Sequence, residues 1–225
     1  MYLNINSLLL LFNMNLVIIT SILKVDNTPL SYYKTRSIYS MIERYSQVLI
    51  TINSIRKYIP NAYIVLLECS KNIGNYELEF RKNVDEYYNY CNNVEIVKEM
   101  SSPYKGVGEV YQMLGLLNSY DISRFNSIIK ISGRYFFNNS FTYSIFDNNE
   151  NIFRGFDNVK VVSTRLYKID KSYFEKFINI LKLSIPYMRN GESQESIFYK
   201  LVTYKNINNL GLSGNVAVSG DYINE

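Results

Sequence analysis

The stretch ERYSQVLITINSIRKYIPNAYIVLLE, residues 43–68, decides the fold class of this chain. Its first part carries apolar side chains at steps of three and four residues, which is the spacing of one helix face: Tyr45, Val48, Leu49, Ile52, Ile55 and Ile59. Pro60-Asn61 ends this pattern, and AYIVLLE at 62–68 is a continuous apolar run typical of a buried strand. A helix that leads into a buried strand indicates a crossover unit.

A second strand stands before this helix. Residues 15–25, NLVIITSILKV, form an apolar run rich in β-branched residues, and residues 26–42 are loop-like. A strand, a helix and another strand in this order imply parallel strands joined by a crossover helix. Further along, the patterns predict helices at 76–90, 109–120, 171–183 and 192–204, strands at 94–99, 127–131 and 160–169, and a short strand in the tail 211–223.

This alternation predicts an α/β fold with a Rossmann-like, mostly parallel central sheet flanked by helices. We expect a single domain over residues 14–225, preceded by an N-terminal extension at 1–13. The apolar run LLLLF in that extension is too short to span a bilayer, and no cationic segment precedes it. We therefore predict no transmembrane segment and a cytoplasmic location.

The composition excludes several kinds of chemistry. The chain has no histidine, so it cannot build a Ser–His–Asp triad or a Cys/His zinc site. A general base must then be a carboxylate, a lysine or a tyrosine. Cys69 and Cys91 are typical of thiols in a reducing compartment. The net charge of +4 is mild and the basic residues are scattered, so we expect no nucleic-acid partner.

Polar side chains follow three of the predicted strands. In parallel sheets, ligands bind beyond the carboxyl ends of the strands. Those ends carry Thr20-Ser21, Glu68-Cys69-Ser70 and Ser132-Gly133-Arg134. Three polar clusters at one edge of a sheet predict a single binding site.

Four blocks of the chain together resemble small glycosyltransferases of the GT-A type, of the kind found in large DNA viruses and bacterial glycan clusters. The blocks are ITS at 19–21, RSIYSMIERYSQVLITINSIRKYIPNAYIVLLECS at 36–70, KGVGE at 105–109 and KISGRY at 130–135. The resemblance covers roughly residues 14–225. It implies a GT-A fold and transfer of a sugar from a nucleotide-sugar donor, with UDP-sugar favoured, to a glycan or another hydroxyl acceptor. For a viral protein the expected location is the host cytoplasm.

The same resemblance implies roles for the strand ends. Thr20 and Ser21 would line the nucleotide pocket, and Glu68 and Ser70 would contact the base or the ribose. Ser132-Gly133-Arg134 would occupy the place of the metal-binding Asp-x-Asp of that fold. We therefore expect no obligatory metal ion, although Mg²⁺ or Mn²⁺ could still bind through the diphosphate.

A cation in that place has a physical rationale. Breaking a sugar–phosphate bond leaves negative charge on the nucleoside diphosphate, and arginine offers a planar, permanently charged fork that suits phosphate. We expect Arg134 to stabilise that charge, and Gly133 to let the backbone approach the ligand. Helpers are expected from neighbouring loops: Lys34, Arg36 and Lys105. The block KGVGE is either a glycine-rich turn that binds an anion or simply the start of a helix.

An inverting transferase also needs a carboxylate near the acceptor hydroxyl. GESQES at 191–196 offers Glu192 and Glu195, of which we favour Glu195, and Asp157 is a further candidate. Acidic residues at a helix start are equally explained by the helix dipole, and a retaining enzyme requires no such base.

Two other functions compete with this reading. A catalytically inactive domain of the same fold would bind a nucleotide sugar or a glycan without turnover. A nucleotidyltransferase is the weaker alternative, because that chemistry relies on carboxylate-held Mg²⁺ and no acidic pair stands at a strand end.

Overall fold

A computed structural model of the protein describes residues 14–225. Its main sheet has seven strands in the order β10-β6-β9-β4-β1-β2-β3. These are β1 (Asn15–Thr20), β2 (Ala62–Glu68), β3 (Glu86–Asn89), β4 (Ser127–Ser132), β6 (Ile152–Phe153), β9 (Leu166–Asp170) and β10 (Lys205–Asn206). Strand β1 pairs in parallel with β2 and β4, whereas β9 is antiparallel to β4 and β6. The predicted α/β fold with a mostly parallel sheet is confirmed; the extension 1–13 lies outside the described residues.

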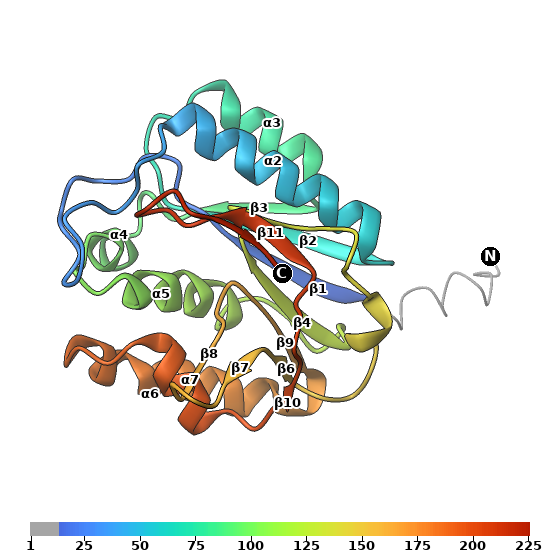
Figure 1. Cartoon of the computed structure of the whole chain (residues 1–225). Helices are drawn as coiled ribbons and strands as arrows, with labels where there is room; N and C mark the ends of the chain where they lie inside the picture. The colour runs from blue at the N-terminus through green and yellow to red at the C-terminus, as the bar shows by residue number, and fades with distance from the viewer. Residues whose placement is uncertain (1–13) are drawn as a thin grey trace.

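Helices cover both faces of this sheet (Figure 1). One face carries α2 (Met41–Tyr58) and α3 (Asn75–Asn83); the other carries α4 (Val94–Met100), α5 (Lys105–Leu117), α6 (Phe174–Arg189) and α7 (Gln194–Leu201). Successive side chains of β1 point to opposite faces. Leu16 and Ile18 therefore join the core beneath α5 and α6, whereas Val17 and Ile19 pack with α2. Burial on both faces explains the continuous apolar run of this strand.

Helix α2 forms where the sequence predicts it, two residues longer at its start. Ser40 is its N-cap: the Ser40 hydroxyl accepts from the Glu43 amide, and the Glu43 carboxylate accepts from the Ser40 amide at 2.7 Å. This reciprocal capping satisfies two backbone donors that the helix leaves unpaired. At the other end Asn61 takes a positive φ of 51°, which turns the chain directly into β2.

Two predictions between residues 76 and 99 are wrong. The expected strand at 94–99 is helix α4, because the Asn93 side chain caps the Ile96 amide at 3.1 Å and only Ile96 and Glu99 are buried, one turn apart. The expected helix at 76–90 ends at Asn83. The residues after it form β3, which pairs in parallel with β2 and buries Tyr87.

Two expected strands are shorter than predicted. The run 15–25 is a strand only to Thr20, because the Leu23 and Lys24 amides bond to the side chains of Glu68 and Ser70. The run 160–169 divides into two pieces. Its first piece, β8 (Val161–Val162), pairs with β7 (Gly155–Phe156) in a hairpin, and the second is β9 of the main sheet.

The predicted tail strand is confirmed within a small antiparallel sheet. It comprises β5 (Tyr135–Phe137), β11 (Leu212–Asn215) and β12 (Tyr222–Asn224). Two short 3-10 segments, η1 (Tyr143–Ile145) and η2 (Lys171–Tyr173), complete the elements of the described chain. No helix among residues 14–225 is both long and apolar enough to cross a membrane.

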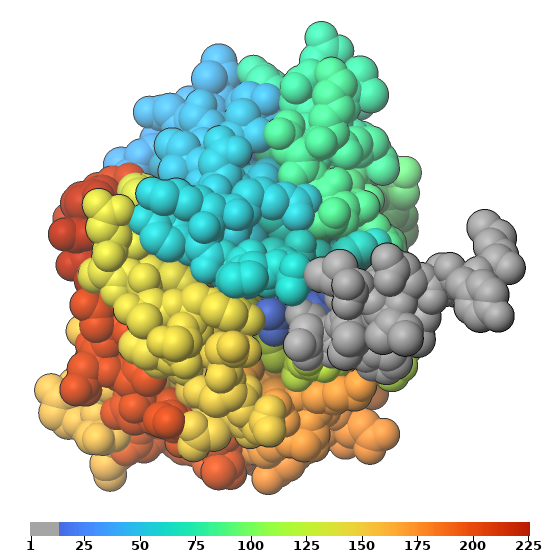
Figure 2. Space-filling model, turned by 90° about the vertical axis from the view of Figure 1, so that its right-hand side faces the viewer, coloured from blue at the N-terminus to red at the C-terminus, as the bar shows by residue number. Residues whose placement is uncertain are grey.

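Figure 2 shows the end of the molecule at which the parallel strands begin. There the last turns of α2 (cyan) lie against the segment that follows β5 (yellow), and the Tyr58 hydroxyl donates to Asn139 at 2.8 Å. The candidate site described next lies at the opposite end, where β1, β2 and β4 finish. In Figure 1 the loop after β1 (blue) and helix α4 border that end.

Gly211 gives a test of the small sheet. It has a φ of +64°, and a Cβ added there would lie 2.3 Å from the Cα atom of Phe141. We expect Gly211→Ala to lower the free energy of unfolding by about 2–4 kcal/mol, since backbone strain and a steric clash add. Gly74→Ala is the control, because Gly74 has a φ of +59° but open space around it, so only about 1 kcal/mol is expected. Equal losses in urea unfolding would contradict the predicted clash.

Candidate active site

The site lies where the direction of chain progression across the sheet reverses. From β1 the chain passes to β2 on one side, and it later returns to β4 on the other side of β1. Such a switch point leaves a crevice at the carboxyl ends of the two central strands. Thr20 and Ser132 are register partners at those ends, and the Gly133 amide donates to the Thr20 carbonyl at 3.0 Å.

Two cavities open at this place, of about 430 Å³ and about 80 Å³, and both are lined by Lys105, Glu109 and Arg134. Most of the predicted site residues line one or both. The larger cavity is lined by Lys105, Ser132, Arg134, Glu192 and Glu195. The smaller cavity is lined by Thr20, Ser21, Arg36, Lys105 and Arg134. Five predicted residues line neither cavity: Lys34, Glu68, Ser70, Gly133 and Asp157.

Arg134 stands between the two cavities as an unpaired cation. Its backbone amide is fixed by the Ser132 carbonyl at 2.7 Å, and its guanidinium lies 5.6 Å from the ring centre of Tyr135. Its Nε atom is buried without a hydrogen-bond partner, and no carboxylate of residues 14–225 forms an ion pair with it. An arginine in this state has its fork of donors free for an anionic ligand.

The structure requires a glycine at position 133 for a different reason from the one expected from the sequence. A Cβ at this position would lie 2.9 Å from Cγ2 of Val48 and 3.3 Å from Cγ2 of Ile19. The missing side chain therefore lets the turn after β4 pack against α2. Contact with a ligand stays a prediction that the geometry does not favour.

Lys105 is the second free cation of the site. It begins α5, and its ammonium group has no hydrogen bond or ion pair with the rest of the described chain. The Lys105 residue is exposed to solvent at the cavity, although many protein atoms lie around its ammonium group. This desolvation, followed by the nearby Arg134 cation, lowers the pKa of Lys105 to about 7, although Glu109 acts in the opposite direction. Its charge at neutral pH therefore responds to small changes in pH.

This pKa predicts a pH dependence for the binding of anions. Below pH 7 Lys105 is charged and attracts a diphosphate, and the charge is lost as the pH rises through about 7. The quantity to compare is the ratio of the UDP affinity at pH 6 to that at pH 8. We expect this ratio to be up to about tenfold larger in the wild type than in Lys105→Arg. The arginine stays charged, and the titration of UDP itself is common to both proteins. Calorimetric titration that gives equal ratios would contradict the role of Lys105.

A buried ion pair underlies these cations. Lys130, in the middle of β4, has no exposed surface, and its ammonium lies 2.7 Å from Glu109 Oε1. It also donates to Ser132 Oγ at 2.9 Å and to the Thr164 carbonyl at 2.8 Å. Burial lowers the pKa of Lys130, and Glu109 opposes that shift. Thr20 donates to Glu109 at 3.2 Å, so this network joins β1, β4 and α5 beneath the site.

Sequence reasoning missed Lys130 and Glu109, although each left a signal. Lys130 interrupts the apolar strand SIIKI two residues before Ser132, and alternation places both side chains on one face. Glu109 follows Lys105 by four residues, which places both on one side of α5.

The two candidate bases differ in their surroundings. Ser193 caps α7 by accepting from the Ser196 amide, and this presents both glutamates to the larger cavity. Glu195 accepts from the Thr164 hydroxyl at 2.7 Å through one oxygen, and its other oxygen has no partner among the described residues. Glu192 instead forms an ion pair of 2.6 Å with the exposed Lys200. The free oxygen favours Glu195 as a proton acceptor.

The guanidinium of Arg36 is bound by other residues of the protein. It pairs with Asp26 at 3.3 Å, and its guanidinium donates to four backbone carbonyls, those of Thr28, Met100, Ser101 and Ser102. These contacts tie the loop after β1 to the segment before α5. The geometry supports a positioning role for Arg36, and ligand binding by it stays a prediction.

Glu68 and Ser70 form the support of the loop after β1. The fully buried Glu68 accepts through Oε1 from the amides of Leu23 and Cys69 at 2.9 and 3.0 Å, and from the Ser70 hydroxyl. Ser70 in turn accepts from the Lys24 amide. The other oxygen of Glu68, Oε2, is buried and has no hydrogen-bond partner among the described residues. The contact of Glu68 with a base or ribose stays a prediction, and Glu68 lines neither cavity.

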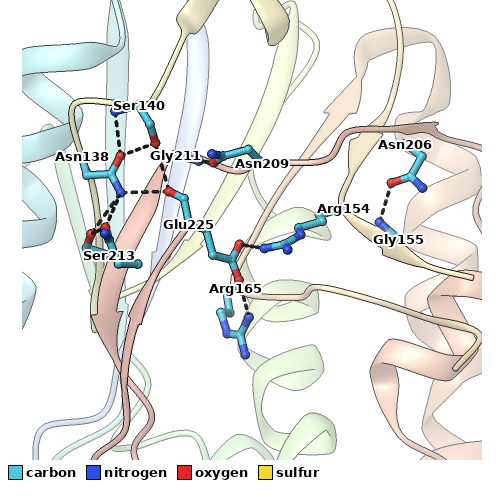
Figure 3. A network of polar contacts seen from close by, with 11 residues as sticks. Asn138, Ser140, Arg154, Gly155, Arg165, Asn206, Asn209, Gly211, Ser213 and Glu225 are labelled. Carbon is cyan, nitrogen blue, oxygen red and sulfur yellow. Dashed lines mark hydrogen bonds and ion pairs between the residues drawn. The ribbon is translucent and has the colours of Figure 1, made fainter. Parts of the chain in front are cut away.

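One wall of the larger cavity is fixed by the network in Figure 3. Arg165, which lines the cavity, pairs with Glu225 Oε1 at 3.0 Å, and Arg154 pairs with the other oxygen at 2.5 Å. The Glu225 backbone oxygen accepts from Asn138 and Ser140. Glu225 therefore connects the segment after β5 to the two arginines. Arg165 is a site residue that the sequence did not reveal.

The donor set does not suit a divalent cation at the place where the resemblance implies one. Two unpaired cations stand there, and the nearby Glu109 is paired with Lys130. Within residues 14–225 no group of three carboxylates or thiols is placed to hold a metal ion. Asp147 lines a separate cavity where β1 and β4 begin, and Asp157 accepts from the Tyr199 hydroxyl outside the site.

Comparisons with known proteins give distant structural neighbours. No family model and no curated protein matches the chain. The apo glycosyltransferase GlyE of Streptococcus pneumoniae is 10% identical, with a TM-score of 0.47 over 87% of this chain and 45% of that chain. Mouse xyloside xylosyltransferase 1 is 8% identical, with a TM-score of 0.44 over 84% and 80% of the two chains.

A third neighbour is 4-diphosphocytidyl-2C-methyl-D-erythritolsynthase of Anaerococcus prevotii, which is 10% identical with a TM-score of 0.44 over 83% and 81% of the two chains. This chain spans less than half the length of GlyE. At these identities and TM-scores the neighbours assign no activity, so the function has to be argued from the site.

Proposed function

We propose that the protein is a glycosyltransferase that moves a sugar from a nucleotide-sugar donor, with a UDP-sugar favoured, to a hydroxyl group of a glycan or another acceptor. The observation that carries this proposal is the unpaired guanidinium of Arg134, which lines one cavity together with Lys105 and Glu195. Cations suited to a leaving diphosphate and a carboxylate suited to an acceptor hydroxyl are the two groups that this transfer needs.

Each group has a defined part in the proposed reaction. The bond between the anomeric carbon and the phosphate oxygen breaks, and its electrons remain on the nucleoside diphosphate. Arg134 and Lys105 stabilise that growing negative charge. Glu195 takes the proton from the acceptor hydroxyl while the acceptor oxygen bonds to the anomeric carbon. Attack on the face opposite the leaving group inverts the configuration.

The surroundings of these residues support the assignment. Thr164 holds one oxygen of Glu195 and leaves the other free, which is the state a proton acceptor needs. Lys130 neutralises Glu109, so the free positive charge of Arg134 and Lys105 is not cancelled by that carboxylate. The cavity of about 430 Å³ falls within the usual size of ligand sites, and Tyr32, Tyr104 and Tyr135 line it with rings on which a sugar can pack.

The proposal is tested by measuring the release of nucleoside diphosphate from UDP-, GDP- and dTDP-sugars with a mixture of hydroxyl acceptors. We expect turnover with at least one donor, and Asp157→Asn, outside both cavities, should match the wild type. Binding of a donor without any turnover would instead favour the inactive binding domain that the sequence also allows.

A further inference from the structure

The smaller cavity carries an excess of positive charge. Four of its lining side chains are cationic: Arg36, Arg44, Lys105 and Arg134. Its two acidic residues are already engaged, since Asp26 pairs with Arg36 at 3.3 Å and Glu109 pairs with Lys130 at 2.7 Å. Three cations are therefore left without a carboxylate partner among the described residues.

Arg44 is the most deeply placed of the three. Only 4% of its surface is exposed. Its Nε donates to the Ile22 carbonyl at 2.5 Å, and one terminal nitrogen donates to the Ser37 hydroxyl at 3.0 Å. The remaining N–H groups of the fork have no partner in residues 14–225. Burying a charge without an ion-pair partner is costly, which indicates that a ligand supplies one.

The nearest alternatives do not supply it. Glu68 attracts Arg44 electrostatically, but it does not come within ion-pair distance. Its Oε1 is bound by Leu23, Cys69 and Ser70, and its buried Oε2 has no hydrogen-bond partner among the described residues. Burial, followed by the neighbouring Arg134 cation, lowers the pKa of Arg44 to about 9, so Arg44 still carries its charge at neutral pH. The two like charges repel each other, and a bound anion relieves this repulsion.

We infer that Arg44, Arg134 and Lys105 form a phosphate-binding subsite in the smaller cavity, which takes one phosphate group without a bridging metal ion. A volume of about 80 Å³ is well below that of a site for a whole ligand, so the cavity admits a single small group. Arginine forks match the oxygens of phosphate. Because Lys105, Glu109 and Arg134 line both cavities, the rest of the molecule extends into the larger one.

The phosphate can come from two sources. Under the proposed function, on which this part rests, it belongs to the diphosphate of the donor, and the sugar then lies toward Glu195. A phosphate carried by another molecule has the same chemistry. The two sources are separated below by comparing UDP with inorganic phosphates.

The test is calorimetric titration with inorganic pyrophosphate, orthophosphate and UDP. We expect Arg44→Met to bind pyrophosphate about 10- to 100-fold more weakly than the wild type, and Arg44→Lys to lie between them. Arg56→Met is the matched control, because Arg56 lies on the same helix but pairs with Asp85 at the far end. It should bind all three ligands as the wild type does.

The outcomes separate the subsite from the proposed function. Weaker binding of UDP together with pyrophosphate assigns the subsite to the donor, whereas a loss confined to the inorganic ligands assigns it to another phosphate. Unchanged affinity for all three ligands in Arg44→Lys overturns the inference, even if Arg44→Met does not fold. If no donor is turned over while pyrophosphate binding still depends on Arg44, the transferase proposal fails and the subsite stands.

Discussion

Replacing Arg134 by alanine is expected to lower turnover by about 10²–10³-fold, the loss typical of removing one preorganised donor to a developing charge. The free guanidinium lines both cavities and no carboxylate of the described chain neutralises it. Because the negative charge on the leaving diphosphate grows toward the transition state, kcat should fall much more than donor affinity. Steady-state kinetics and donor titration together measure the two effects.

Arg134→Lys is expected to recover only a small part of this loss. A point charge does not reproduce the planar fork that contacts two phosphate oxygens at once. Arg81→Ala serves as the control, since Arg81 is exposed on α3 and pairs with Glu77. A lysine variant with full activity would show that charge alone matters at this position.

Replacing Glu195 by glutamine is expected to lower kcat by about 10²–10⁴-fold, because the variant keeps the shape of the side chain and removes the proton acceptor. Donor affinity should stay nearly constant, since the proposed contact of Glu195 is with the acceptor hydroxyl. The Thr164 hydroxyl can still donate to the amide oxygen, so the fold is preserved.

Glu192→Gln is the matched control for this change. It lies three residues earlier, lines the same cavity and pairs with Lys200. Full activity in Glu195→Gln with a loss in Glu192→Gln would transfer the role to Glu192. Full activity in both variants would leave the inverting mechanism without a base.

The central part of the fold could be predicted because it depends on local patterns. Residues 43–68 carry a helical period, a Pro-Asn stop and an apolar run in direct succession, and each signal agrees with the next. The prediction for 94–99 is wrong because the valines and isoleucine of this segment favour a strand. The Asn93 cap and the one-turn spacing of Ile96 and Glu99 override that preference.

The candidate site could be predicted in part for the same reason. Arg134 and Ser132 follow a buried strand, and parallel strands bring their carboxyl ends together. Arg44 and Arg165 could not be found in this way. Arg44 enters the site from a helix face that reads as polar, and Arg165 from a segment between two strands, so both depend on how distant elements pack.

The most direct test of the account is release of nucleoside diphosphate, measured for the wild type and Arg134→Ala after exhaustive chelation and again with added Mn²⁺. If Arg134 takes the place of a metal ion, the wild type turns over its donor in the presence of chelator, Mn²⁺ changes the rate little, and Arg134→Ala is slow in both conditions. Activity that chelation abolishes and Mn²⁺ restores, equal in the two proteins, would contradict this account.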